Sequence, residues 1–97
     1  MDMEEIQYLL GSAIFARAKK YVNRIESYGC KTEENGVRHL SAEVEGSGDN
    51  LYETESWLRQ NGSFISASCT CPYNANGNGV FCKHIGALLL YDQNETA

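Results

Sequence analysis

The sequence has few basic residues: 8 lysines and arginines stand against 13 aspartates and glutamates, for a formal net charge of −5. A free-standing nucleic-acid-binding domain normally presents an excess of Lys and Arg to phosphates, so this composition is a poor match for one. Apolar runs long enough to span a membrane are also absent, and no apolar signal peptide begins the chain. We therefore expect no membrane partner, and any nucleic-acid contact would have to use a local basic patch.

The marks of a catalytic site are also missing from the sequence. The glycines at 77 and 79 lack the Lys-Ser/Thr pair that would follow them in a phosphate-binding loop. No nucleophile with a neighbouring base is indicated, and His39 is expected to be solvated on the polar face of a strand. Paired strands could align four glutamates, but without a pocket an exposed acidic face is the better interpretation of Glu43, Glu45, Glu53 and Glu55. We therefore expect neither an enzyme nor a small-molecule substrate.

The sequence does contain two pairs of potential metal ligands near its end, in the segments Cys69-Thr70-Cys71-Pro72 and Cys82-Lys83-His84. Three thiolates and one imidazole are a ligand set of four-coordinate structural zinc sites. On a strand, Cys69 and Cys71 would point to the same side. Cys82 and His84 can converge only if Cys82 precedes a helix and His84 lies in its first turn. The pattern predicts one structural Zn²⁺ bound by Cys69, Cys71, Cys82 and His84, with no open position for a catalytic water.

These residues have two other interpretations besides zinc binding. The cysteines could be buried thiols beside a chance histidine, or they could form disulfides in a secreted domain. A disulfide between Cys69 and Cys71 would be strained, and the spacing of the cysteines suits a reducing compartment, so we predict zinc and a cytoplasmic location. The fourth cysteine, Cys30, has no partner in the pattern and is expected to be a small apolar residue near a strand.

Apolar spacing predicts an α+β fold in one small domain that spans residues 1–97. A helix is expected from Met1 to about Tyr21, within a helical lead-in over 1–28, because apolar residues recur there at helical spacing. Gly11 weakens the middle of this helix and could mark a break in it. Residues 22–28 could extend the helix or begin a strand.

A three-stranded antiparallel meander is expected over 37–71, where the apolar period changes to two. In its first strand Leu40, Ala42 and Val44 should face the core; the other strands are expected at Leu51–Arg59 and Phe64–Cys71. Asn61-Gly62 predicts a type I′ turn between these last two strands. The final strand should carry Ile65 and Ala67 on the same face as its cysteines.

A surface loop over 73–79 is expected to lead into a C-terminal helix, so that the zinc finger and its helix occupy 69–92. This segment resembles the SWIM zinc finger, whose signature is Cys-x-Cys, a variable gap and Cys-x-His. Pro72, Lys83 and the apolar run from Ile85 to Leu90 are similar to that family as well.

The upstream chain resembles the region before the finger in bacterial Swi/Snf-type helicase-like ATPases. The similar segments are the helix end at 16–21, the strand and turn at 42–47, and the strand around Tyr52. The resemblance implies a non-catalytic module that contacts DNA or a protein partner, and a chain that is a fragment of a larger, ATPase-like protein.

Two functional hypotheses follow from these observations. In the first, the module binds DNA weakly and in a salt-sensitive way, through Lys83 at the finger and through the basic patch Arg17, Lys19, Lys20 and Arg24. In the alternative, the domain is a purely structural zinc-stapled unit that packs against neighbouring domains and contacts no nucleic acid. The basic patch would then be a solvated face that complements the C-terminal end of its helix.

Overall fold

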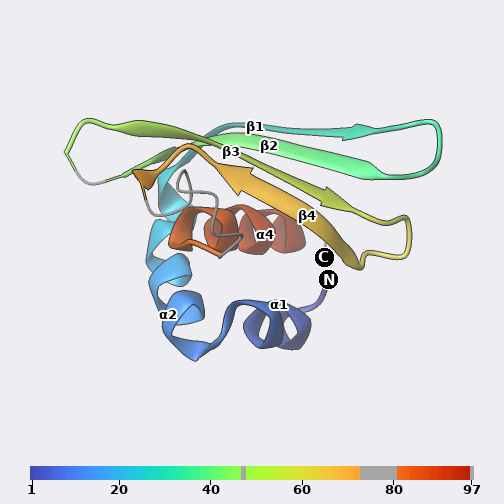
Figure 1. The fold of residues 1–97 in the computed structure, drawn as a ribbon, viewed down its shortest axis with the longest axis horizontal. Coiled ribbons are helices and arrows are strands. Elements are labelled where there is room, and N and C mark those ends of the chain that lie inside the picture. Colours follow the sequence, from blue (N-terminus) through green and yellow to red (C-terminus); the bar gives the residue numbers. More distant parts are fainter. Residues whose placement is uncertain (47, 73–80, 97) are drawn as a thin grey trace.

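A computed structural model of the chain describes residues 1–46, 48–72 and 81–96, and these form an α+β fold (Figure 1). A four-stranded antiparallel sheet, in the order β1-β2-β3-β4, carries the helices on one face. The elements are α1 (Met3–Leu10), α2 (Ser12–Tyr21), the 3-10 turn η1 (Val22–Arg24), β1 (Ile25–Thr32), β2 (Arg38–Glu45), β3 (Leu51–Leu58), β4 (Phe64–Cys69) and α4 (Lys83–Thr96). None of the helices in these ranges is long and apolar enough to cross a membrane. The surface loop expected at 73–79 lies outside the described residues.

The N-terminal segment forms two helices where the sequence predicted one. Asp2 begins α1 with a capping box, in which its side chain accepts the Glu5 N–H at 2.9 Å and the Glu5 side chain accepts the Asp2 N–H at 3.3 Å. The chain breaks at Gly11, whose φ of 82° lies in the region that favours glycine. The break lets α1 and α2 both contact α4.

The strand β1 is the main difference from the predicted topology, because it adds a fourth strand to the meander. The helical lead-in ends at Arg24, and residues 25–28, left open between helix and strand, belong to β1. A bulge separates Glu26 from Gly29 in the pairing with β2, and Ser27 within it has a φ of 54°. The bulge disrupts the alternation of buried and exposed residues, so β1 lacks the period of two by which a strand is found in a sequence.

Two of the hairpin turns share one geometry. In the turn after β3, the Gly62 N–H donates to the Arg59 carbonyl at 2.8 Å, and the Arg59 N–H donates to the Ser63 carbonyl at 2.8 Å. Gly62 has a φ of 92°, whereas Asn61 is not among the residues with positive φ. The predicted type I′ turn is therefore wrong: a longer turn with one left-handed glycine closes this hairpin. The turn between β1 and β2 repeats these bonds around Gly36.

The last strand is shorter and less regular than predicted. β4 ends at Cys69, and a register shift beside Leu58 pairs that residue with Phe64. The shift leaves Ile65 40% exposed, although the sequence placed it on the inward face. Beyond the shift, Ala67 is partly buried against the core and Cys69 is buried, so the inward face is restored before the first metal ligand.

The core lies around α4, which is packed between the sheet and α2 (Figure 1). Its residues from His84 to Leu90 are all buried, so the helix has no solvent-facing side over this stretch. The sheet contributes the inward face predicted for β2, which is Leu40, Ala42 and Val44, and the buried face of β3, which is Thr54, Ser56 and Leu58. The metal-ligating end of the chain thus leads directly into the central helix of the domain.

Candidate metal centre

Four ligand atoms converge where β4 ends and α4 begins. Those of Cys69, Cys71, Cys82 and His84 all lie within 4.8 Å of one another, and all four residues are buried. The Cys69 Sγ lies 3.8 Å from the His84 Nδ1. Two such ligands on a tetrahedral zinc would be about 3.6 Å apart, given bonds of about 2.3 Å and about 2.05 Å. The cluster therefore fits one structural zinc ion, as the sequence predicted.

The start of α4 makes the Cys-x-His pair converge. Cys82 directly precedes the helix, and its carbonyl accepts the Gly86 N–H at 3.1 Å. Its thiol also receives the Ile85 N–H at 3.5 Å. His84 is consequently the second residue of the helix and lies in its first turn. This is the arrangement that the spacing required, because the two side chains would diverge on a continuous helix.

The surroundings of Cys69 and Cys82 shift the pKa values of these two thiols in opposite directions. A hydrogen bond from Cys82, together with smaller contributions from His84 and Thr54, lowers the pKa of Cys69 to about 4 against the opposing effect of burial. The same hydrogen bond and burial raise the pKa of Cys82. Thr54, which is fully buried on β3, places its Oγ1 3.4 Å from the Cys69 Sγ. These groups favour the thiolate that zinc binds at Cys69.

Aromatic rings hold the imidazole of His84 in place. The Tyr52 ring lies 4.9 Å from it and the Tyr21 ring 5.3 Å, the latter edge-on. Gly46 is buried behind Tyr52, and a Cβ at this position would overlap the Tyr52 ring. The His84 Nε2 is buried without a hydrogen-bond partner among the described residues, while Nδ1 faces Cys69. Nδ1 is thus the ring nitrogen that is seen to face another ligand of the cluster.

The predicted basic residues divide into two groups around this centre. Lys83 and Arg24 approach one ring, with the Lys83 Nζ 4.7 Å and the Arg24 Cζ 4.8 Å from the centroid of Tyr21. Arg17 lines a pocket of about 360 Å³ beside the cluster, together with Lys83 and His84.

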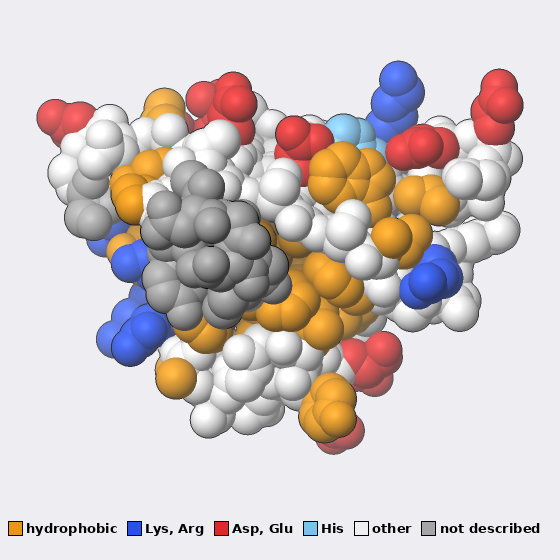
Figure 2. All heavy atoms as spheres, viewed as in Figure 1, with side chains coloured by type: hydrophobic (Ala, Val, Ile, Leu, Met, Phe, Trp, Pro, Cys, Tyr) orange, Lys and Arg blue, Asp and Glu red, His pale blue; other side chains and the backbone are white. Residues whose placement is uncertain are grey.

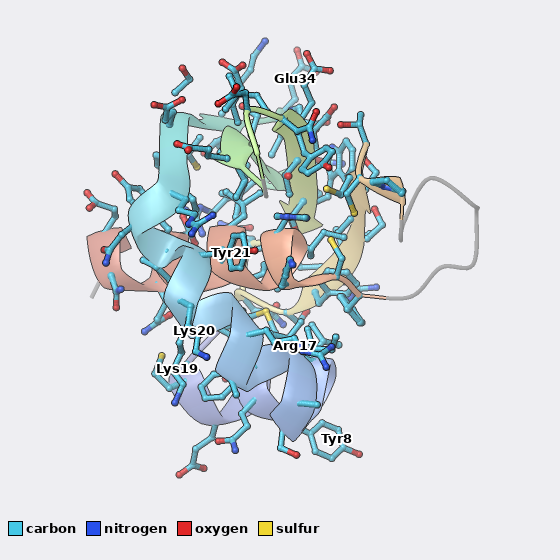
Figure 3. The ribbon with its side chains drawn as sticks, turned by 90° about the vertical axis from the view of Figure 1, so that its left-hand side faces the viewer. Tyr8, Arg17, Lys19, Lys20, Tyr21 and Glu34 are labelled. Carbon is cyan, nitrogen blue, oxygen red and sulfur yellow. The ribbon has the colours of Figure 1, made fainter. Side chains whose placement is uncertain are left out.

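The other two basic residues of the patch lie elsewhere. Lys19 sits over the ring of Phe15 at 5.0 Å, and Lys20 is exposed. Figure 3 shows both on one side of α2 and Arg17 on the other. The fold therefore separates a patch that the sequence treated as one.

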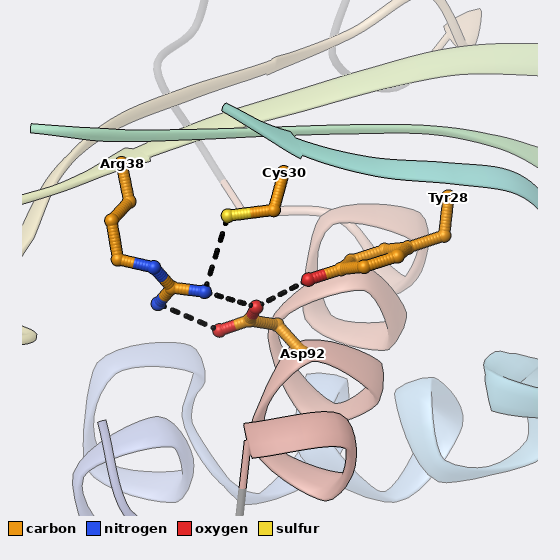
Figure 4. Close-up of polar contacts among 4 residues, drawn as sticks. All are labelled: Tyr28, Cys30, Arg38 and Asp92. Atoms are coloured by element: carbon orange, nitrogen blue, oxygen red, sulfur yellow. Dashed lines mark hydrogen bonds and ion pairs between the residues drawn. The ribbon is translucent and has the colours of Figure 1, made fainter. Parts of the chain in front are cut away.

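A polar cluster that no sequence pattern indicated lies near the end of α4 that is away from the zinc ligands (Figure 4). Arg38 donates to both oxygens of Asp92, at 2.7 and 3.2 Å, and the Tyr28 hydroxyl donates to the same carboxylate at 2.5 Å. Burial and the hydrogen bond to Asp92 raise the pKa of Tyr28. These partners are 54 and 64 residues apart in the chain, so no local pattern could have identified them.

The structure refines two expectations for single residues. Cys30, expected near a strand, lies on β1 itself, where it is exposed and accepts a hydrogen bond from Arg38 to its sulfur at 3.3 Å. His39 is not simply solvated: its ring stacks on Trp57 with 4.7 Å between centroids, and its Nε2 lies 2.7 Å from a Glu55 oxygen. Both contacts cross between strands, which is why residue type alone did not indicate them.

Comparison with protein families finds a match for the metal-binding part of the chain. Residues 53–93 match the family model of the SWIM zinc finger, a range that covers most of β3, all of β4, the four ligands and most of α4. No curated protein and no solved structure matches the chain. The helices α1 and α2 and the strands β1 and β2 precede the matched range.

Proposed function

Because residues 53–93 form a SWIM zinc finger, we propose that this domain is a non-catalytic module that contacts DNA phosphates through basic side chains beside its zinc centre. One observation carries the proposal. Lys83 from the finger and Arg24 from η1 both lie against the ring of Tyr21. Arg17 lines the pocket of about 360 Å³ that Lys83 also lines. Three cations from separate segments are thus gathered at the metal centre.

Zinc makes Lys83 a well-placed contact. Its backbone lies between two ligands, Cys82 and His84, and at the first residue of α4. A helix N-terminus carries partial positive charge, which adds to the attraction between Lys83 and a phosphate. The metal would fix the position of this backbone, so zinc loading and DNA affinity should be coupled.

The overall charge limits the affinity. Figure 2 shows several acidic side chains along the side formed by the sheet. Some of the Lys and Arg side chains in this view lie beside α2 and η1, and others lie towards the opposite end of the sheet. With a net charge of −5, the domain should bind duplex DNA non-specifically, with a Kd of roughly 10⁻⁴ M or weaker at physiological salt. In this proposal Lys19 and Lys20 contribute only long-range attraction, because they lie away from the pocket.

The proposal extends to the protein from which the domain comes, a helicase-like ATPase in the cytoplasm. Its support is the resemblance of residues 16–21 and 42–47 to the segments that precede the finger in such ATPases. The second candidate function is a structural unit that packs against neighbouring domains. The polar cluster of Arg38, Asp92 and Tyr28 favours it, because that cluster joins β1, β2 and α4 at a place away from the zinc ligands.

The test is a titration of labelled duplex DNA with the zinc-loaded protein at low and at physiological salt. We expect binding that weakens with salt, and a marked loss for Lys83→Glu with zinc retained. Lys31→Glu is the matched control, because it makes the same charge change on an exposed residue of β1. Absence of binding at low salt, or equal loss in both variants, would favour the structural unit.

A further inference from the structure

The outer face of the sheet, opposite the helices, presents rows of paired side chains. The pairing of β1, β2 and β3 aligns Glu26 with Glu43 and Glu43 with Glu53. The next row towards the middle of the sheet holds Gly29, Ser41 and Glu55, and the row beyond it holds Lys31, His39 and Trp57. A carboxylate row and an aromatic pair thus lie on either side of a row of mostly small residues.

A hollow of about 200 Å³ lies among these rows, where the side chains are short. It is lined by Ser27, Ser41, Glu43, Glu53 and Glu55, with Ala42 and Thr54 at its base. The space corresponds to about six or seven waters at about 30 Å³ each, and it is smaller than the 300 Å³ or so at which ligand pockets usually begin. Its size therefore suits one inserted side chain better than a whole small molecule.

The carboxylates of this hollow are only partly compensated. Glu55 contacts His39, but within the described part of the chain the carboxylates of Glu43 and Glu53 have no hydrogen bond and no ion pair. Like charges directly opposite each other on paired strands are destabilising, and Glu26 adds a third in the same row. A cation placed between the strands would relieve this repulsion.

The aromatic pair next to the hollow adds a second kind of contact. The rings of His39 and Trp57 are parallel to within 3°, and the Nε2 of His39 is held by Glu55. Trp57 lies two residues from Glu55 on the same face of β3. A lysine or arginine side chain could therefore lay its aliphatic stem or its cation along Trp57 while its charged end meets the carboxylates.

We propose that this face is a docking site for a basic peptide segment, with one Lys or Arg side chain inserted in the hollow between Glu43 and Glu53 and resting against Trp57. We choose a basic partner because its charge is opposite to that of the carboxylates in the hollow. A second copy of this chain, with its net charge of −5, is repelled by the same carboxylates, and so is nucleic acid. The site lies on the sheet, away from the zinc centre, and does not depend on DNA binding there.

The single tryptophan of the chain gives a direct measurement. The zinc-loaded protein is titrated with a blocked peptide of alternating lysine and glycine, and the emission of Trp57 is followed. We expect a saturable change that weakens with salt, and no change with the same peptide after acetylation of its lysines, which removes their charge. No response to the lysine peptide would overturn the proposal.

A pair of double variants distinguishes the hollow from general attraction by net charge. Glu43→Gln with Glu53→Gln should weaken peptide binding about five- to tenfold, since two exposed charge pairs are lost. Glu4→Gln with Glu34→Gln removes the same charge from exposed positions outside the hollow and should change binding less than about twofold. Equal weakening in both double variants would overturn the site. So would an emission response to Mg²⁺ or Ca²⁺ without a response to the peptide, which would identify a metal site instead.

Discussion

Gly86 of α4 faces Ala18 of α2 so closely that a Cβ added to the glycine would lie 2.7 Å from the Cβ of Ala18 and 2.9 Å from a methyl of Leu10. Real Cβ atoms essentially never come this close to a neighbour, so the two helices can pack at this distance only because residue 86 has no side chain. The contact joins the finger helix to the N-terminal helices, which precede the segment matched to the SWIM family.

Gly86→Ala should therefore destabilise the domain, although alanine has a higher helix propensity than glycine and so favours α4 by itself. Overpacking typically costs about 1–3 kcal/mol, and the gain in helix propensity returns up to about 1 kcal/mol. We expect a lower midpoint of urea unfolding with zinc bound. Gly29→Ala is the control, because its nearest neighbour would be the Ser41 Oγ at 3.4 Å and its φ is not in the left-handed region. Equal midpoints for the two variants would mean that α2 and α4 can separate freely.

Thr54→Val should weaken zinc binding without opening the core. The substitution keeps the shape of a fully buried residue and removes the hydroxyl that contacts the Cys69 Sγ at 3.4 Å. Loss of a partner that supports a metal ligand typically costs about 10- to 100-fold in affinity, and we expect the lower end, measured by competition with a chromophoric chelator. Ser56→Ala is the control: Ser56 is equally buried on β3, but its hydroxyl donates to the Ser66 carbonyl. Matching affinities in the two variants would contradict a role for Thr54 at the metal centre.

Gly46→Ala should disturb the metal centre from outside it. The added methyl would overlap the Tyr52 ring, which lies 4.9 Å from His84, so the ring must move. We expect faster zinc transfer to a chelator, and a changed imidazole environment in the NMR spectrum of His84. Gly29→Ala serves as the comparison, because its Cβ would meet only the Ser41 Oγ, at 3.4 Å, and its φ is not in the left-handed region. A His84 signal identical to that of the unmodified protein would show that Tyr52 does not position the ligand.

Asp92→Asn should destabilise the domain at the part of α4 that lies away from the zinc ligands. The change removes the charge that pairs with Arg38 at 2.7 Å, at a position where Asp92 is only 4% exposed. Leaving the half-buried guanidinium with a neutral partner should cost about 1–3 kcal/mol of unfolding free energy. Glu95→Gln removes one charge from an exposed position of the same helix and should be near neutral. If the two variants unfold alike, the Arg38–Asp92 pair contributes no more than an exposed ion pair.

Loss of zinc should loosen the whole domain. Cys82→Ser removes one of the four ligands, and the binding energy of a structural zinc is largely folding energy. From the sequence we would expect residues 63–91 to loosen first. However, α4 packs against the sheet on one side and α2 on the other, so we expect hydrogen exchange in α2 and β2 to rise with that in α4. Protection that persists in α2 and β2 would show instead that only the finger segment, residues 63–91, depends on zinc.

The sequence by itself determined the metal centre and most of the elements. The four ligands could be identified because zinc requires particular side chains at spacings that a strand end and a helix start provide. The inward face of β2 followed from strict alternation, with Leu40, Ala42 and Val44 buried as expected. These features depend on residues close together in the chain, which a sequence displays directly.

Only the tertiary structure decided what depends on residues far apart. β1 exists because its backbone pairs with β2. Its bulge at Ser27 interrupts the alternation of buried and exposed residues by which a strand is recognised in a sequence. The meeting of Lys83 and Arg24 at Tyr21, the pairing of Arg38 with Asp92, and the hollow between Glu43 and Glu53 each join separate elements. Such contacts are set by strand register and by the packing of α4 on the sheet, because these bring together side chains whose separation in the chain carries no local signal.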